Sequence, residues 1–243
     1  MDGNAVLIRP CSLAPLVLLA AAIGVALLLS GCGERLTSYR YRLTVEVETP
    51  EGLRTGSSVI EARPRRGVAF PGPEAASLLV DHSGEAVVVD LGARGILFAL
   101  LTPAHATHVT GGYEWALMPG PHPPELATDP AARYRALAAV RGNVEVRQDR
   151  LPLLVRFRDV RAPASVERVY PDDLERPFGA DVRLRRITVE ITNDAVEHRI
   201  ADVLPWLPQY VSDNGRRLNG TRSLVVRNND IIANLGPGSF IVE

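Results

Sequence analysis

A cluster of carboxylates is the first candidate for chemistry in this chain. Asp172, Asp173 and Glu175 share one short segment, and such a set can bind Ca²⁺ or pair a general acid with an ionised carboxylate. The spacing is not that of an EF-hand loop. Acidic residues are also favoured in the first turn of a helix, where they interact with the helix dipole. We therefore expect the start of a short helix and assign no catalytic residue.

Histidines form the second candidate. His105 and His108 are separated by two residues, and His122 follows in the same stretch. Zinc requires three or four ligands in fixed geometry, whereas residues 102–127 are rich in Pro, Gly and His and are predicted to form a long irregular loop. We expect solvent-exposed histidines and assign no metal site.

The segment Asp81-His82-Ser83 contains the residue types of a hydrolytic triad. The nucleophile and the orienting acid must reach the imidazole from opposite sides, which adjacent residues cannot do. The chain also lacks a Gly-x-Ser-x-Gly nucleophile elbow. The segment is therefore predicted to be a turn before a strand.

Five arginines on two predicted neighbouring strands form a basic candidate surface. They are Arg156 and Arg158 on one strand and Arg183, Arg185 and Arg186 on the other. Guanidinium groups match carboxylates and phosphates, so this face could bind an anionic ligand or a lipid headgroup. Charges also pair across strands, and the available acids are Glu167, Glu175 and Glu190. We expect mainly a solvated, charge-paired face.

Trp206 and the nearby Tyr210 are the aromatic candidates. An exposed pair would mark a protein-binding patch. Large aromatic side chains bury much apolar surface, so we expect Trp206 to plug the core after a helix.

Composition excludes several kinds of chemistry. The net charge is −1, which gives no electrostatic case for nucleic acid. All 27 basic residues are arginines, so a Schiff-base lysine, a P-loop lysine and a Ser-Lys dyad are excluded. No motif for a cofactor is found, and none is predicted.

The N-terminus predicts export and lipid attachment. Residues 13–29 are almost wholly apolar and are followed by small residues, which is the order of a secretory signal. The ending Leu29-Ser30-Gly31-Cys32 resembles the bacterial lipobox. That resemblance implies a lipidated Cys32 and a cell-envelope protein that faces the periplasm. The alternative is an uncleaved membrane-spanning helix.

Two further expectations depend on this resemblance. In lipoproteins, an Asp directly after the Cys favours inner-membrane retention, and Gly33 stands there, so the outer membrane is favoured. Cys11 leaves with the signal, and an acylated Cys32 leaves the mature chain without a free thiol, a disulfide or a cysteine metal site.

Hydropathy patterns predict a strand-rich fold. Residues 39–48 alternate between apolar and polar side chains, as in a half-buried strand. Further strands are expected at 54–62, 85–91, 95–101, 151–160, 182–192, 223–227 and 239–243, and helices at 130–141 and 195–204.

The predicted fold class is α+β, mainly antiparallel β with two helices, after an N-terminal apolar signal helix. The predicted domains are a signal peptide at 1–31, a tether at 32–38 and one β-rich domain at 39–243. Two lobes joined near 119–124 are the alternative.

Three stretches are similar to an uncharacterised family of proteobacterial proteins. They are residues 39–60, 152–179 and 183–192. The resemblance implies a single folded unit and brings no catalytic residue or ligand.

The favoured function is a lipid-anchored, non-enzymatic module that binds an envelope protein or a small anionic ligand. The alternatives are an envelope hydrolase, which would use the carboxylate cluster or a metal site in the histidine loop, and a purely structural envelope component. A deep arginine-lined pocket would favour the ligand, and a flat Trp206–Tyr210 patch would favour a protein partner.

Replacing the lipobox cysteine tests the anchor. Cys32→Ser should abolish incorporation of labelled palmitate, because diacylglyceryl transfer requires the thiol. Cys11→Ser is the matched control and should label like the parent chain. Palmitate in Cys32→Ser would contradict lipidation at this residue.

Overall fold

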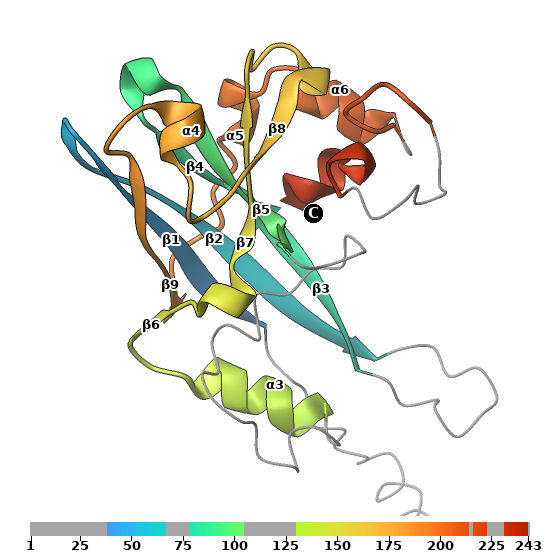
Figure 1. Ribbon diagram of the computed structural model, residues 1–243. Helices are drawn as coiled ribbons and strands as arrows, with labels where there is room; N and C mark the ends of the chain where they lie inside the picture. The colour runs from blue at the N-terminus through green and yellow to red at the C-terminus, as the bar shows by residue number, and fades with distance from the viewer. Residues whose placement is uncertain (1–37, 67–77, 105–129, 214–215, 223–230, 243) are drawn as a thin grey trace, which may run out of the picture. The chain divides into compact units, whose positions relative to one another are not determined.

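A computed structural model describes residues 38–66, 78–104, 130–213, 216–222 and 231–242. Leu36–Glu243 form one compact unit. This unit is mainly antiparallel β with four short α-helices in its described part (Figure 1). No helix among these residues is long and apolar enough to span a bilayer.

Ten strands make up two sheets in the described part of the chain. The strands are β1 (Tyr39–Thr49), β2 (Gly52–Arg66), β3 (Leu78–Glu85), β4 (Val87–Asp90), β5 (Ile96–Pro103), β6 (Asn143–Glu145), β7 (Pro152–Phe157), β8 (Val166–Val169), β9 (Arg183–Thr192) and β10 (Ile241–Val242). The strand order is β10-β3-β2-β1-β9-β6 in the six-stranded sheet and β4-β5-β7-β8 in the four-stranded sheet. The helices are α3 (Pro130–Ala139), α4 (Glu175–Phe178), α5 (Ile200–Val203) and α6 (Leu207–Ser212).

Strand β1 is central to the six-stranded sheet and has the predicted alternation. Tyr41, Leu43 and Val45 are at most 1% exposed, whereas the residues between them are partly exposed. β1 pairs in antiparallel fashion with β2 on one side and β9 on the other. Each buried Leu or Val contributes roughly 1.5–3 kcal/mol of transfer free energy, so this one face supplies much of the driving force for folding.

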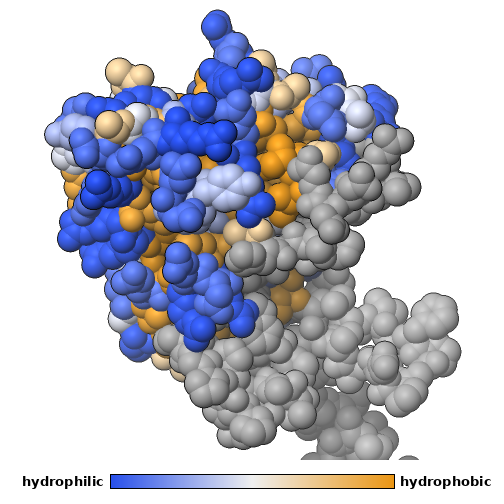
Figure 2. Space-filling view, viewed as in Figure 1, coloured by the Kyte–Doolittle hydropathy of each residue, from blue (hydrophilic) through white to orange (hydrophobic). Residues whose placement is uncertain are grey.

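The four-stranded sheet is buried on both faces. Leu97 and Ala99 of β5 belong to the core shared with the six-stranded sheet. Phe98 and Leu100 alternate with them and belong to a second core, which also contains Phe240 and residues of α5 and α6. This placement explains why residues 96–101 of β5 are all apolar. Figure 2 shows hydrophilic residues over much of one face, with apolar residues visible between them.

The two sheets touch backbone to backbone at Gly56. A Cβ built on this glycine would lie 2.1 Å from the carbonyl oxygen of Val88 in β4. Every other residue type carries a Cβ, so glycine alone permits this approach. The Gly56–Val88 contact therefore sets how closely β2 and β4 pack.

Helix α3 packs against the end of the six-stranded sheet where β1 begins. The hydroxyl of Tyr134 donates a 2.9 Å hydrogen bond to the carbonyl of Ala62. The rings of Tyr134 and Tyr39 are 4.9 Å apart. The predicted helix is confirmed, and Gly142 follows it with a positive φ of 85°.

The predicted helix at 195–204 is wrong in length. Residues 193–199 are not helical, and α5 is a single turn that begins at Ile200. Arg40 donates to the carbonyls of Asn193 and Asp194 at 3.3 Å. The buried Glu85 carboxylate accepts the N–H groups of Arg199 and Ile200 at 2.7 and 2.9 Å. These tertiary contacts hold the segment and replace helical hydrogen bonds.

The helix count therefore differs from the expected two. The described residues contain four short α-helices, because α4, α5 and α6 are separate pieces. Three strands, β3, β6 and β8, were also not predicted. β3 includes Asp81-His82-Ser83, and β8 forms a hairpin with β7. β3 is a strand because its residues pair with β2, a long-range partner that a local turn signal does not reveal.

The C-terminal predictions have mixed outcomes. Trp206 is 8% exposed, and its ring N–H donates to the carbonyl of Val160 at 2.8 Å. The prediction that Trp206 packs in the core is therefore confirmed. The strand predicted at 239–243 shortens to β10. The strand predicted at 223–227 lies outside the described residues.

The Gly56–Val88 contact predicts a strong effect of one methyl group. Gly56→Ala should lower the free energy of unfolding by about 1–3 kcal/mol, the usual cost of overpacking, as measured by urea denaturation. Gly238→Ala is the control, because a Cβ there meets nothing within 4 Å. Equal stability of the two variants would contradict the contact.

Candidate functional site

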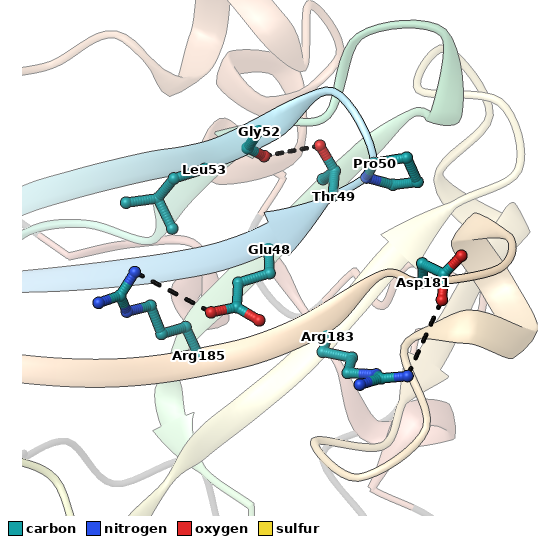
Figure 3. A pocket seen from close by; sticks show the side chains of 8 residues that line it. All are labelled: Glu48, Thr49, Pro50, Gly52, Leu53, Asp181, Arg183 and Arg185. Carbon is teal, nitrogen blue, oxygen red and sulfur yellow. Dashed lines mark hydrogen bonds and ion pairs between the residues drawn. The ribbon is translucent and has the colours of Figure 1, made fainter.

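An open groove lies beside the turn between β1 and β2 and the start of β9. Its volume is about 430 Å³, within the range of small-molecule sites. Figure 3 shows the residues that line it: Glu48, Thr49, Pro50, Gly52, Leu53, Asp181, Arg183 and Arg185.

The turn at residues 49–52, which connects β1 to β2, forms one wall of the groove. The Thr49 hydroxyl donates a 2.7 Å hydrogen bond to the carbonyl of Gly52 (Figure 3). Gly52 has a φ of 116°, which side-chain-bearing residues rarely adopt. Leu53 follows and is 49% exposed, so the wall offers an apolar contact next to polar groups.

A β-bulge in β9 forms the opposite wall. Glu46 of β1 lies opposite Arg186, and the next residue, Val47, lies opposite Leu184. Arg185 is therefore the extra residue of a bulge, which breaks the alternation of faces. Arg185 and Arg186 are both exposed as a result, together with Arg183.

The three arginines differ in how they are paired. Arg186 donates a 2.8 Å hydrogen bond to Glu46, and this bond, opposed by partial burial, holds the pKa of Glu46 below its ordinary value. Arg185 lies 3.5 Å from Glu46 and 3.9 Å from Glu48.

Arg183 is held as loosely as Arg185. It lies 3.6 Å from Glu175 and 3.9 Å from Asp181 (Figure 3). These four separations for Arg183 and Arg185 exceed hydrogen-bond length. Each guanidinium group therefore has carboxylates nearby that balance its charge, but it makes no hydrogen bond to them.

An ion pair between Arg94 and Glu51 stabilises the β1–β2 turn. Arg94 binds both carboxylate oxygens of Glu51 at 2.9 and 3.1 Å and donates to the carbonyl of Phe178 at 3.1 Å. The hydrogen bond from Arg94 lowers the pKa of Glu51 to about 2. This contact links the β1–β2 turn to the β4–β5 connection and to α4, and it holds the groove's turn in place.

The predicted pairing of these arginines with carboxylates is confirmed for Arg156, Arg158 and Arg183, but the predicted single face is wrong. Arg156 and Arg158 both contact Glu167, at 3.0 and 2.9 Å. Arg156 lies on β7 and Arg158 directly follows this strand. β7 belongs to the four-stranded sheet and not to the sheet of β9, so the five arginines do not form one surface. Glu190 pairs with Arg42 of β1 at 3.5 Å.

The carboxylate cluster supports the start of α4. Asp172, Asp173 and Glu175 are exposed. Asp173 accepts a 3.2 Å hydrogen bond from the backbone N–H of Arg176. Within the described ranges, no group of three or more His, Cys, Asp or Glu side chains could hold a metal ion.

The remaining candidate residues are the Asp81-His82-Ser83 segment, three histidines and Cys32. Asp81, His82 and Ser83 are consecutive in β3, so His82 points to the face opposite its two neighbours. His105, His108, His122 and Cys32 lie outside the described residues.

Sequence reasoning found the arginines but missed what surrounds them. The pocket depends on the bulge and on the β1–β2 turn, which lies more than a hundred residues earlier in the chain. One signal was available. In Val182–Thr192 the apolar residues alternate except at the doubled arginine, Arg185-Arg186, and such a break in period is typical of a bulge.

Comparisons with protein-family models, curated proteins and solved structures find no match to this chain. The resemblance of the body to a proteobacterial family therefore stays a prediction.

The Glu51–Arg94 pair predicts a specific pH dependence of stability. Because the pKa of Glu51 is lowered from 4.5 to about 2, its stabilising effect is complete above pH 4.5 and is lost as the pH falls towards about 2. Glu51→Gln and Arg94→Gln should each flatten the decline in the free energy of unfolding over this window, as measured by denaturant titration. Parent-like slopes in both variants would contradict the pair.

Proposed function

We propose that this chain is a lipid-anchored cell-envelope protein whose folded domain binds a small anionic ligand and catalyses no reaction. The anchor is Cys32 of the lipobox. The observation that carries the binding role is the groove, which Arg183 and Arg185 of β9 both line, with separations of 3.5–3.9 Å to their acidic neighbours.

Ligand recognition would use these two guanidinium groups. An incoming carboxylate or phosphate can accept charge-assisted hydrogen bonds from a planar guanidinium fork. The longer contacts to Glu48 and Asp181 give way at little cost, because exposed ion pairs contribute only about 0–1 kcal/mol. Leu53 would contact an apolar part of the ligand.

The rival site for a protein partner has less support. Trp206 and Tyr210 are each 8% exposed, and the ring N–H of Trp206 is bound to Val160. Arg216 lies over the Tyr210 ring at 4.1 Å. These side chains stabilise the second core, so the arginine-lined groove is the better candidate.

The position of the groove favours a soluble ligand. The tether enters β1 at Tyr39, and the groove lies at the other end of this strand of 11 residues. At roughly 3.3 Å per residue, the strand extends over about 35 Å. The groove therefore lies far along the strand from the anchored end of the domain.

A double substitution tests the groove. Binding of citrate, succinate and inorganic phosphate should be measured by calorimetry. Arg183→Gln with Arg185→Gln should weaken binding by at least about tenfold, because hydrogen bonds to charged groups contribute about 1.5–3 kcal/mol.

The matched control removes the same charge elsewhere. Arg158 and Arg161 are exposed, with side-chain accessibilities of 68% and 82%, and Arg158→Gln with Arg161→Gln should bind like the parent. The proposal fails if the parent binds none of the three anions, or if both double variants bind equally.

A further inference from the structure

We infer that the ligand of the groove is an α-amino acid with an apolar side chain, a choice of ligand class that rests on the binding role proposed above. At neutral pH such a molecule carries an ammonium group, a carboxylate and an apolar group on one carbon atom. The groove holds a partner for each of these three groups on neighbouring strands.

Three strands place an apolar, an acidic and a basic side chain in one row. Glu48 of β1 pairs with Leu53 of β2 on one side and with Arg183 of β9 on the other. Residues directly opposite each other in an antiparallel pair share one face of the sheet, with Cβ atoms about 4.5–5.5 Å apart. All three side chains are exposed and line the groove (Figure 3).

The lining of the groove carries both signs of charge in equal number. Its charged members are two arginines and two acids: Arg183, Arg185, Glu48 and Asp181. Glu48 is the strand partner of Arg183 and also lies 3.9 Å from Arg185. Asp181 lies 3.9 Å from Arg183 (Figure 3). A cation and an anion of one ligand would therefore each find a group of opposite charge.

A ligand with negative charge alone matches this pattern poorly. Arg185 also has Glu46 at 3.5 Å, and Arg183 has Glu175 at 3.6 Å. A simple anion on either guanidinium group would lie close to these carboxylates, and like charges repel. An ammonium group on the same ligand offsets this repulsion, because it can donate hydrogen bonds to Glu48.

The row of side chains sets how the amino acid would bind. Its carboxylate would accept charge-assisted hydrogen bonds from Arg183, and its ammonium group would donate to Glu48. Its side chain would contact Leu53, which is 49% exposed, and this contact would remove apolar surface from water. The groove volume of about 430 Å³ accommodates a molecule of this size.

Four small molecules that differ by one group test this pattern. Binding of leucine, isocaproate, isopentylamine and glycine to the full-length protein should be measured by NMR titration. Isocaproate lacks the ammonium group of leucine, isopentylamine lacks its carboxylate, and glycine lacks its side chain. Leucine should bind about tenfold more tightly than isocaproate or isopentylamine, because each of these loses a charge-assisted hydrogen bond, and more tightly than glycine.

A substitution at Glu48 identifies the partner of the ammonium group. Glu48→Gln should weaken leucine binding by about tenfold without weakening isocaproate binding, because the carboxylate that repels an anion is removed. Glu197→Gln is the matched control, since this side chain is also exposed, at 60%, and it should bind both molecules like the parent. A Glu48→Gln variant that keeps the preference for leucine, or that loses both molecules equally, would overturn the inference.

A substitution at Leu53 tests the apolar contact. Leu53→Ala should reduce the preference for leucine over glycine by about threefold. Val211→Ala is the control, because Val211 is 42% exposed on α6 and does not line the groove. An equal preference in the two variants would contradict the contact with Leu53.

The same titrations separate the ligand class from the binding role. If citrate, succinate or phosphate binds and leucine binds no better than isocaproate, the amino acid is wrong and the anion-binding role stands. If leucine binds and none of the three anions does, the role as a site for simple anions is wrong and the amino acid stands. Binding of none of these molecules contradicts both.

Discussion

The structure depends on a four-stranded sheet whose strand β5 is apolar and buried on both faces. Such a sheet cannot leave either face in water, so one face requires the six-stranded sheet and the other requires the C-terminal helices. The Gly56–Val88 contact brings the first pair of layers close enough to exclude water. The Phe98, Phe157 and Phe240 rings, 5.5–6.2 Å apart, fill the second interface. The burial of these two layers sets the positions of the surface features.

The outer face of the six-stranded sheet carries the charged residues that this arrangement leaves in solvent. Opposite charges lie across neighbouring strands, as with Arg42 and Glu190 or Arg186 and Glu46, and such pairs contribute modestly to stability. The bulge at Arg185 changes this pattern at one place. It adds Arg185 to the exposed face with no carboxylate closer than 3.5 Å, and this loosely paired guanidinium is the chemical basis of the proposed binding role.

The elements that were predicted correctly have sequence patterns that lie within a few consecutive residues. The alternation of β1, the turn at residues 49–52 and the start of α3 at Pro130 were all visible in short windows of sequence. The elements that were missed or misjudged depend on distant partners. β3 looks like a turn until β2 pairs with it, and residues 193–199 look like a helix until Arg40 and Glu85 bind their backbone.

The sequence by itself determined the chemical inventory, with arginine as the sole long-chain cation and two cysteines, one of them in a Leu-Ser-Gly-Cys sequence, and it predicted an antiparallel β-rich fold. Residue types and short periodicities are local properties, so they can be read without a structure. The tertiary structure alone decided that Arg156 and Arg183 belong to different sheets and that a turn near residue 50 meets a bulge near residue 185. Those outcomes depend on which strands pair and which faces are buried, and long-range burial is a property of the whole chain.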